Sequence, residues 1–304
     1  GINDRFVEQT DGTYKNQELN INEKYNFFNP KAGISYIKDG HKAYASVAYS
    51  HREPERNNFT DNYNYPFPKQ EKLLDVEFGY QYQGSNWHAG ANFYYMGYDN
   101  QLVQTGQESE IGEALTTNVK DSYRMGVELS AGWAPLSWLS FEGNAALSKN
   151  KIKDFDEYVE DWGSNTGTRV NHYDNSTLSF SPSAILNGFV DFHYAGFSAT
   201  WHTNFVSSQY LDNSESKDRS LPCYSQSDLS LNYTSAVKKA LGIKQVTLGL
   251  DFNNVFNRHY APSGFVWYNA INEEGGYTND HRLTALSYIP MAGFTCMAHL
   301  TLKF

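Results

Sequence analysis

The chain has 304 residues, a formal net charge of −10 and a mean hydropathy of −0.62, values that at first suggest an acidic soluble protein. It contains no run of about 18 apolar residues, which excludes a transmembrane helix, and its 24 Lys and Arg residues are scattered, which argues against a nucleic-acid partner. Two cysteines without a zinc-type spacing exclude a disulfide framework and structural zinc. Hydrophobic residues make up 40% and aromatic residues 16%, so the distribution of apolar residues along the chain matters more than their total.

Alternation of apolar and polar residues recurs through the chain, as in a strand whose two faces meet different surroundings. In residues 292–304, for example, Phe294, Leu300 and Leu302 lie on one face and Thr295 and Lys303 on the other. The pattern predicts eleven strands, in chain order over residues 31–37, 42–50, 75–82, 87–95, 124–133, 139–148, 182–195, 197–205, 228–233, 245–253 and 292–304.

The segments between these strands alternate in length. Short turns are predicted at residues 38–41, 84–86, 135–137, 195–196 and 236–243, whereas long polar and aromatic loops are predicted at about 51–70, 98–118, 150–181, 208–221 and 257–288. All of the long loops therefore leave one end of the predicted sheet. Short turns at one end and long loops at the other are typical of an outer-membrane β-barrel.

Periodicity alone does not say whether the apolar face points inward, as in a soluble barrel or sandwich, or outward into lipid. Aromatic residues such as Trp87, Trp133 and Tyr194 cluster at strand ends, as in membrane-interface girdles, and charged residues such as Glu128 and Asp251 occupy the polar face. Charges on that face would be unfavourable in a dry core. The sequence favours an all-β, antiparallel, up-and-down transmembrane barrel.

Eleven strands do not close such a barrel, because bacterial single-chain barrels have even strand numbers and an open sheet would leave unpaired edges in lipid. Eleven is half of twenty-two, the strand number of the large plugged outer-membrane transporters. We therefore predict that residues 1–28 are part of an extracellular loop, and that residues 29–304 form the C-terminal half of a 22-stranded barrel whose plug and first half lie outside this chain.

Six short motifs occur in a fixed order along the chain. They are Asn29–Ile34 (NPKAGI), Tyr44–Pro54 (YASVAYSHREP), Glu71–Tyr82 (EKLLDVEFGYQY), Asn92–Val103 (NFYYMGYDNQLV), Asn118–Leu129 (NVKDSYRMGVEL) and Leu250–Tyr260 (LDFNNVFNRHY). With these motifs and its terminal Phe304, nearly the whole chain resembles the C-terminal half of the barrel of TonB-dependent outer-membrane receptors.

The resemblance implies active import of a scarce nutrient across the outer membrane, without enzymatic activity and without a bound cofactor. An iron–siderophore or similar metal chelate is the expected ligand, and the alternatives are haem, cobalamin or glycan import, or a passive porin or structural barrel. The implied partners are TonB, acting through the missing N-terminal region, the plug and the first half of the barrel, and outer-membrane lipid; a surface lipoprotein is a further candidate.

The long loops carry aromatic residues interspersed with Arg, His and Asn, a mixture suited to chelates and sugars because aromatic rings provide contact area and polar groups provide orientation. The same residues could instead pack the loops against one another. The candidate ligand-binding residues are Arg52, Phe59, Tyr63, Trp162, Tyr260, Trp267, Tyr268, His281 and Arg282.

Three further patterns bear on haem binding, on calcium binding and on the state of the cysteines. His51 begins a loop, but the Phe-Arg-Ala-Pro pattern of haem receptors is replaced by His51-Arg52-Glu53-Pro54, so haem is not favoured. The acidic stretch 154–161 lacks the residue order of a calcium loop and is interpreted as a solvated surface. Cys223 and Cys296 are predicted to be free thiols, because one strand lies between the strands to which they belong and their Cα atoms are therefore too far apart for a disulfide.

Overall fold

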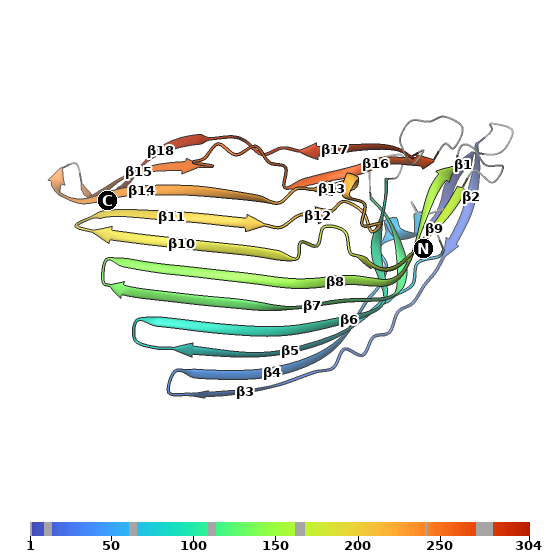
Figure 1. Cartoon of the computed structure of the whole chain (residues 1–304), viewed down its shortest axis with the longest axis horizontal. Coiled ribbons are helices and arrows are strands. Elements are labelled where there is room, and N and C mark those ends of the chain that lie inside the picture. Colours follow the sequence, from blue (N-terminus) through green and yellow to red (C-terminus); the bar gives the residue numbers. More distant parts are fainter. Residues whose placement is uncertain are drawn as a thin grey trace.

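A computed structural model of the chain describes residues 2–8, 14–60, 66–108, 114–161, 168–240, 242–271 and 282–304. Its main feature is a curved antiparallel sheet in which eleven strands follow one another as an up-and-down meander (Figure 1). In order across the sheet these are β3 (Lys31–Lys38), β4 (His41–Arg52), β5 (Glu71–Gln83), β6 (Trp87–Glu108), β7 (Ala114–Leu136), β8 (Leu139–Asp161), β10 (Ala184–Tyr194), β11 (Phe197–Val206), β14 (Tyr224–Ala240), β15 (Ile243–Asn253) and β18 (Thr295–Lys303). The predicted eleven-stranded fold is confirmed.

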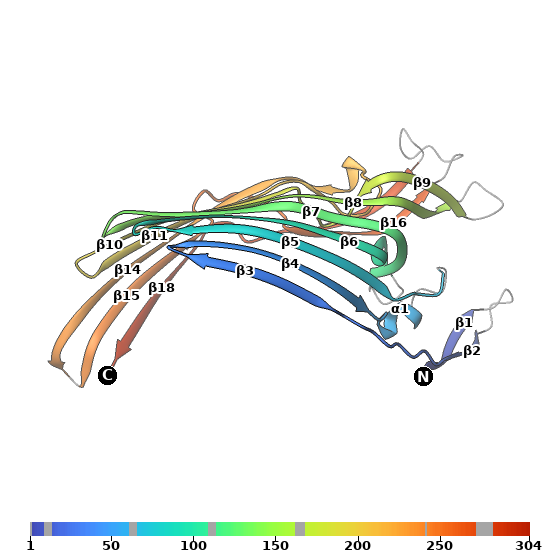
Figure 2. The ribbon, with the colours of Figure 1, turned by 90° about the horizontal axis from the view of Figure 1, so that it is seen from below.

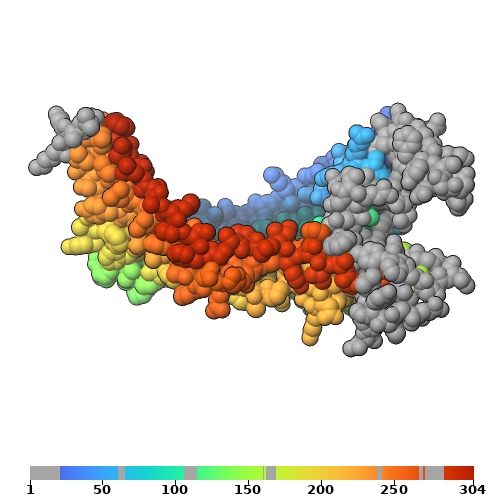
Figure 3. All heavy atoms as spheres, turned by 90° about the horizontal axis from the view of Figure 1, so that it is seen from above, coloured from blue at the N-terminus to red at the C-terminus, as the bar shows by residue number. Residues whose placement is uncertain are grey.

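The sheet is bent into a trough and does not close on itself (Figures 2 and 3). Strands β3 and β18 are its two outer strands, and within the described residues neither pairs with another strand on its outer side. Every residue of β3 and of β18 is solvent-exposed in the isolated chain. The described sheet thus has two free edges.

The short turns lie at one end of the sheet, as the alternation of short turns and long loops along the chain predicted. We call this the short-turn end. Asp39 and Gly40 both have positive φ (50° and 82°), as do Ala195 and Gly196 (49° and 84°), the conformation of a two-residue type I′ hairpin turn. In both turns only a residue without a Cβ fits the second position, because a Cβ on Gly40 or on Gly196 would lie 2.3 Å from a carbonyl oxygen of the neighbouring strand.

The opposite end, the long-loop end, contains more regular structure than the sequence predicted. Strands β6, β7 and β8 run far into the predicted loops, and β9 (Thr168–Thr177) pairs with the extension of β8. Hairpin β16 (Ser263–Ile271) and β17 (Arg282–Ile289) reaches back to pair with the end of β8 at Glu160 and Asp161. The remaining elements are β1 (Ile2–Glu8), β2 (Tyr14–Ile21), α1 (Arg56–Thr60), β12 (Gln209–Tyr210), η1 (Lys217–Arg219) and β13 (Ser220–Leu221).

Buried apolar residues gather at the long-loop end rather than between two layers of sheet. One cluster contains Val103, Val119, Ile152, Phe155 and Leu178 from β6, β7, the extended β8 and the segment after β9. A second contains Leu211, Leu221 and Val266. The extended strands and the segments between them therefore pack into a layer with its own small cores.

The two faces of the meander differ as predicted. One, the apolar face, carries large side chains that stay exposed, such as Phe78 (55% exposed), Trp133 (53%) and Leu248 (57%). The other, the polar face, is joined by hydrogen bonds between neighbouring strands, such as Asn92 Nδ2 to Glu128 Oε2 at 3.1 Å. Among the described residues no second layer covers the apolar face along the meander, so its partner must be something other than this part of the chain.

No helix in the described part of the chain has the length and apolar character needed to cross a membrane. Cys223 and Cys296 are both exposed free thiols, as predicted, with β15 lying between β14 and β18.

Candidate functional site

Arg52 is the last residue of β4, at the long-loop end of the sheet. Its Nε lies 2.8 Å from a carboxylate oxygen of Glu71, the first residue of β5, while the other Glu71 oxygen accepts a hydrogen bond from the amide of Leu102. Glu71 is nearly buried and Arg52 remains largely exposed. Arg52 therefore links the ends of β4 and β5, and its guanidinium group remains largely accessible to solvent.

Phe59 lies in α1, directly after β4. Its ring meets that of Phe67 edge-to-face at 5.1 Å, and the same ring lines a cavity of about 450 Å³ together with Tyr25, Glu53 and Arg56. Two of the candidate ligand-binding residues, Arg52 and Phe59, therefore lie on consecutive elements at one side of the sheet.

Tyr260 lies at the other side, in the segment that follows β15. Its ring stacks on Tyr224 with centroids 4.4 Å apart, and its hydroxyl donates a hydrogen bond to Gln226 in β14. The two tyrosines line a cavity of about 370 Å³ whose wall also contains Arg258 and His259. The side chain of Arg258 is exposed, and no hydrogen bond or ion pair of its guanidinium occurs within the described residues.

The structure does not bring the nine predicted residues into one cluster. Arg52 and Phe59 belong to one end of the strand order and Tyr260 to the other. Trp267 and Tyr268 belong to β16 and Arg282 begins β17, but the structure describes only the backbone of these three residues and not their side chains. Tyr63, Trp162 and His281 lie outside the described residues altogether.

A buried ionic network that sequence reasoning missed holds the segment 207–221 against β8. The Arg219 side chain is almost fully enclosed; its Nε donates to Asp212 and its Nη2 lies 3.1 Å from Glu157 Oε1. The other Glu157 oxygen accepts hydrogen bonds from Tyr173 and Asn171 in β9. In the sequence, Arg219 stands in a run of polar and charged residues that looks like a solvated loop, so no local signal marks its burial.

Two further residues, Asn213 and Glu215, hold this segment in place. Asn213, fully buried, donates to the carbonyl of Gln104 and accepts from the amide of Ser179. Glu215 pairs with Lys151 at 2.5 Å; burial alone would raise the pKa of Glu215, but its hydrogen bonds to Lys151 and Thr177 lower it. The segment 207–221 is therefore a fixed part of the long-loop layer.

Histidines on the polar face pair with carboxylates. His88 lies 3.2 Å from Glu142, and His299 lies 3.3 Å from Asp251. His202 lies 3.6 Å from Asp228 and stacks on Phe189 at 4.3 Å. Each of these three imidazoles therefore interacts with a carboxylate of the same polar face.

A fourth histidine, His172 in β9, faces three aspartates. Its Nδ1 lies 2.8 Å from Asp156 and 3.5 Å from Asp154, and its Nε2 lies 3.4 Å from Asp174. Side-chain atoms of Asp154, Asp156 and His172 approach within 4.8 Å of one another, as metal ligands would, but all three residues are exposed. The hydrogen bond to Asp156 is the main cause of a raised pKa for His172, and the nearby charge of Asp154 adds to it.

Residues 4–255 match the family described as TonB dependent receptor-like, beta-barrel. No curated protein sequence matches the chain. Among solved structures, the ferric-catecholate import receptor Fiu from E. coli K12 is similar with a TM-score of 0.63 and 17% identity, covering 96% of this chain and 37% of that one. The copper transporter OprC gives 0.61 and 18%, covering 90% and 39% of the two chains. The ferric yersiniabactin uptake receptor FyuA from Yersinia pestis gives 0.58 and 15%, covering 91% and 37%.

At these identities the solved structures show the fold alone, and the chain spans less than two-fifths of the length of each of the three. The family is one of outer-membrane transport proteins and not of enzymes, which identifies the polar face as the barrel lumen and the apolar face as the lipid-contacting surface. The family match covers most of the sequence, and the chain belongs to the TonB-dependent receptor family as part of its outer-membrane β-barrel.

Proposed function

We propose that this chain is part of a receptor that imports a metal chelate, with an iron–siderophore as the expected ligand, by TonB-dependent transport. In this proposal residues 1–28 belong to an extracellular loop and residues 29–304 form the C-terminal half of the barrel. A plug and the first half of the barrel complete the receptor, and TonB engages it through the N-terminal region. A surface lipoprotein is a further candidate partner at the extracellular end.

The observation that carries the choice of ligand is the cavity beside Tyr224 and Tyr260. A stacked pair of rings offers a flat apolar surface, and Arg258 supplies a cation that no described side chain neutralises. Many ferric siderophores are anionic and carry aromatic rings, so stacking and charge attraction act together on them. The names of similar structures, a ferric-catecholate receptor and a ferric yersiniabactin receptor, support the same class.

Growth and binding assays on the full-length receptor that contains this chain test the proposal. A strain that depends on this receptor is supplied in turn with ferric catecholates, haem, cobalamin and oligosaccharides. We expect growth on a ferric chelate only, and loss of that growth when the plug is deleted. Growth on haem, cobalamin or a glycan instead would reject the siderophore assignment, and uptake that continues without TonB would indicate a passive barrel.

The candidate residues are tested by binding of the ferric chelate. We expect Arg258→Gln and Tyr260→Ala each to weaken binding about tenfold, since a desolvated cation–π or stacking contact contributes roughly 1–2 kcal/mol. Lys217→Gln, an exposed cation on the neighbouring segment, is the matched control and should bind like the wild type. Unchanged affinity of both site variants would place the ligand elsewhere, and the cavity beside Phe59 is then the next site to test.

A further inference from the structure

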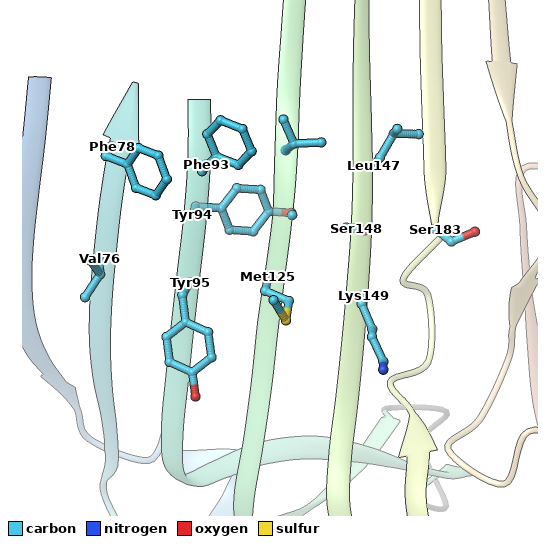
Figure 4. Close-up of a pocket in the computed structure, with 12 residues that line it drawn as sticks. Val76, Phe78, Phe93, Tyr94, Tyr95, Met125, Leu147, Ser148, Lys149 and Ser183 are labelled. Carbon is cyan, nitrogen blue, oxygen red and sulfur yellow. The ribbon is translucent and has the colours of Figure 1, made fainter. Parts of the chain in front are cut away.

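The apolar face contains a groove of about 610 Å³ on strands β5–β8, outside the lumen (Figure 4). Phe78, Phe93 and Tyr95 form one side, Leu147 and Lys149 form the other, and Val127 lies between them. The rings of Phe78 and Phe93 stack at 4.8 Å, which makes that side a continuous flat wall. A groove of this volume, lined mainly by apolar side chains, can accommodate a hydrocarbon chain.

Lys149 is the single charged residue among those that line this groove. It is exposed, and its ammonium group has no hydrogen-bond or ion-pair partner within the described residues. Strand pairing places it in one row with Val76, Tyr95 and Met125, so its neighbours along the row are all uncharged. Its ammonium group therefore has no counter-charge from the strands beside it.

Two other lysines of the same face, further toward the long-loop end, each have a carboxylate nearby. Lys151, the next outward residue of β8, pairs with Glu215 at 2.5 Å. Lys72 on β5 lies opposite Asp99 on β6 in the strand register. Of the three lysines, Lys149 thus lies farthest from the long-loop end, and it alone has no carboxylate either opposite it in the register or at ion-pair distance within the described residues.

The height of Lys149 places it at the outer membrane interface. It is eight residues from Phe141, whose ring stacks on Trp133 at the short-turn end. At about 3.3 Å per residue and a strand tilt of about 40°, this separation is roughly 20 Å along the membrane normal, against an apolar band about 25 Å tall. Tyr95 lies in the same register row as Lys149, and its ring stacks on that of Tyr123 in the next row outward, so aromatic rings of the kind that form interface girdles lie close to Lys149. A flexible lysine there reaches the level of lipid phosphates.

We propose that the groove on β5–β8 binds a phosphate-bearing lipid of the outer leaflet, with an acyl chain along Phe78, Phe93 and Leu147 and a headgroup phosphate on Lys149. The apolar groove fixes the chain and the unpaired ammonium selects an anionic headgroup over a zwitterionic one. The site is a feature of the lipid-facing wall and is independent of the transported ligand.

Native mass spectrometry of the full-length receptor in detergent tests this site, with bisphosphorylated lipid A as the probe. We expect Lys149→Gln to reduce affinity about fivefold, the contribution of one basic residue near an anionic lipid surface, and Lys149→Arg to retain it. Val127→Trp, which fills the groove without removing charge, should reduce occupancy as well. Lys38→Gln, an exposed lysine at the opposite end of the barrel, is the matched control and should bind like the wild type.

A second series uses the headgroup as the variable. Dephosphorylated lipid A and phosphatidylethanolamine should each bind the wild-type receptor as weakly as lipid A binds the Lys149→Gln variant. Equal binding of phosphorylated and dephosphorylated lipid, or an unchanged affinity of Lys149→Gln, would overturn the proposal, since the lipid would then be a non-selective annular layer.

Discussion

Arg219 is an enclosed cation that joins two parts of the chain far apart in sequence. Only 1% of the residue is exposed, and its partners Asp212 and Glu157 are buried with it. Because three desolvated charges are stable only together, loss of the arginine removes the cation that Asp212 and Glu157 share in this network. The network therefore decides whether the segment 207–221 stays on the β8–β9 hairpin.

We expect Arg219→Met to destabilise the packing of this segment by about 3–5 kcal/mol, the usual effect of removing one partner from a buried ion pair. Hydrogen exchange of the full-length receptor measures it as lost amide protection in residues 207–221, with β10 and β11 unchanged. Lys217→Ala, an exposed lysine two residues away, is the control. Wild-type protection in the Arg219→Met receptor would show that the apolar cluster of Leu211, Leu221 and Val266 suffices to hold the segment.

His172 makes the stability of the β8–β9 hairpin depend on pH. Its hydrogen bond to Asp156, with the nearby charge of Asp154, raises its folded-state pKa above the ordinary 6.5. Since the folded state binds the proton more tightly than the unfolded state, the contribution of His172 to stability is complete below about pH 6.5. It is lost as the pH rises through the raised folded-state pKa.

Amide protection in β9 is therefore expected to fall as the pH is raised from 6 to 9, after correction for the intrinsic exchange rate. His172→Gln should remove this pH dependence, because glutamine keeps a hydrogen-bonding group and does not titrate in this range. The same dependence in wild type and in His172→Gln would assign it to another group.

At the scale of elements, the turn between β10 and β11 carries a strained residue. Ala195 has φ = 49°, a conformation that alanine adopts at a cost of about 1 kcal/mol and that asparagine tolerates better. We expect Ala195→Asn to stabilise the barrel by about 0.5–1 kcal/mol and Gly196→Ala to destabilise it, since the added Cβ would meet the carbonyl oxygen of Thr234. The temperature at which the folded form of the full-length receptor is lost on gel electrophoresis measures both.

The equivalent turn between β3 and β4 provides the control. Asp39 already has a side chain suited to positive φ, so Asp39→Asn should leave the unfolding temperature unchanged. An equal rise for Asp39→Asn and Ala195→Asn would mean that the gain comes from asparagine itself and not from relief of strain at residue 195.

The sequence predicted the membrane-spanning part of each strand and the order of the strands, because lipid on one side and lumen on the other impose strict alternation. It did not predict how far strands β6, β7 and β8 continue, because beyond the membrane both faces meet protein or water and alternation fades. In β8 the buried residues change parity, from Asn150 and Ile152 to Phe155, Glu157 and Val159, and this shift cannot be read from residue types.

The candidate site was predicted less completely for the same reason. Aromatic and cationic residues could be assigned to loops, but which of them meet depends on contacts between segments distant in sequence, such as that of Tyr260 with Gln226 in β14. The sequence identified Tyr260 and Phe59 as candidate ligand-binding aromatic residues of the loops; only the fold separates them onto opposite sides of the sheet. Arg258, next to Tyr260 in space, was not selected from the sequence.

At the scale of the whole molecule, the free edges of β3 and β18 require further strands as pairing partners. A strand edge in hydrocarbon leaves amide and carbonyl groups without partners, and each costs several kcal/mol. All eight residues of β3 and all nine of β18 are exposed in the isolated chain. In the proposed barrel these two strands pair with strands outside this sequence.

Hydrogen exchange of the full-length receptor in detergent tests this pairing. We expect the amides of β3 and β18 to exchange as slowly as those of β10 and β11, each of which pairs on both sides in the described sheet. The 304-residue chain expressed alone should show fast exchange in β3 and β18 and should not insert as a resistant barrel. A 34.6 kDa species that forms a closed, protease-resistant barrel by itself would contradict the assignment of the chain to half of a larger barrel.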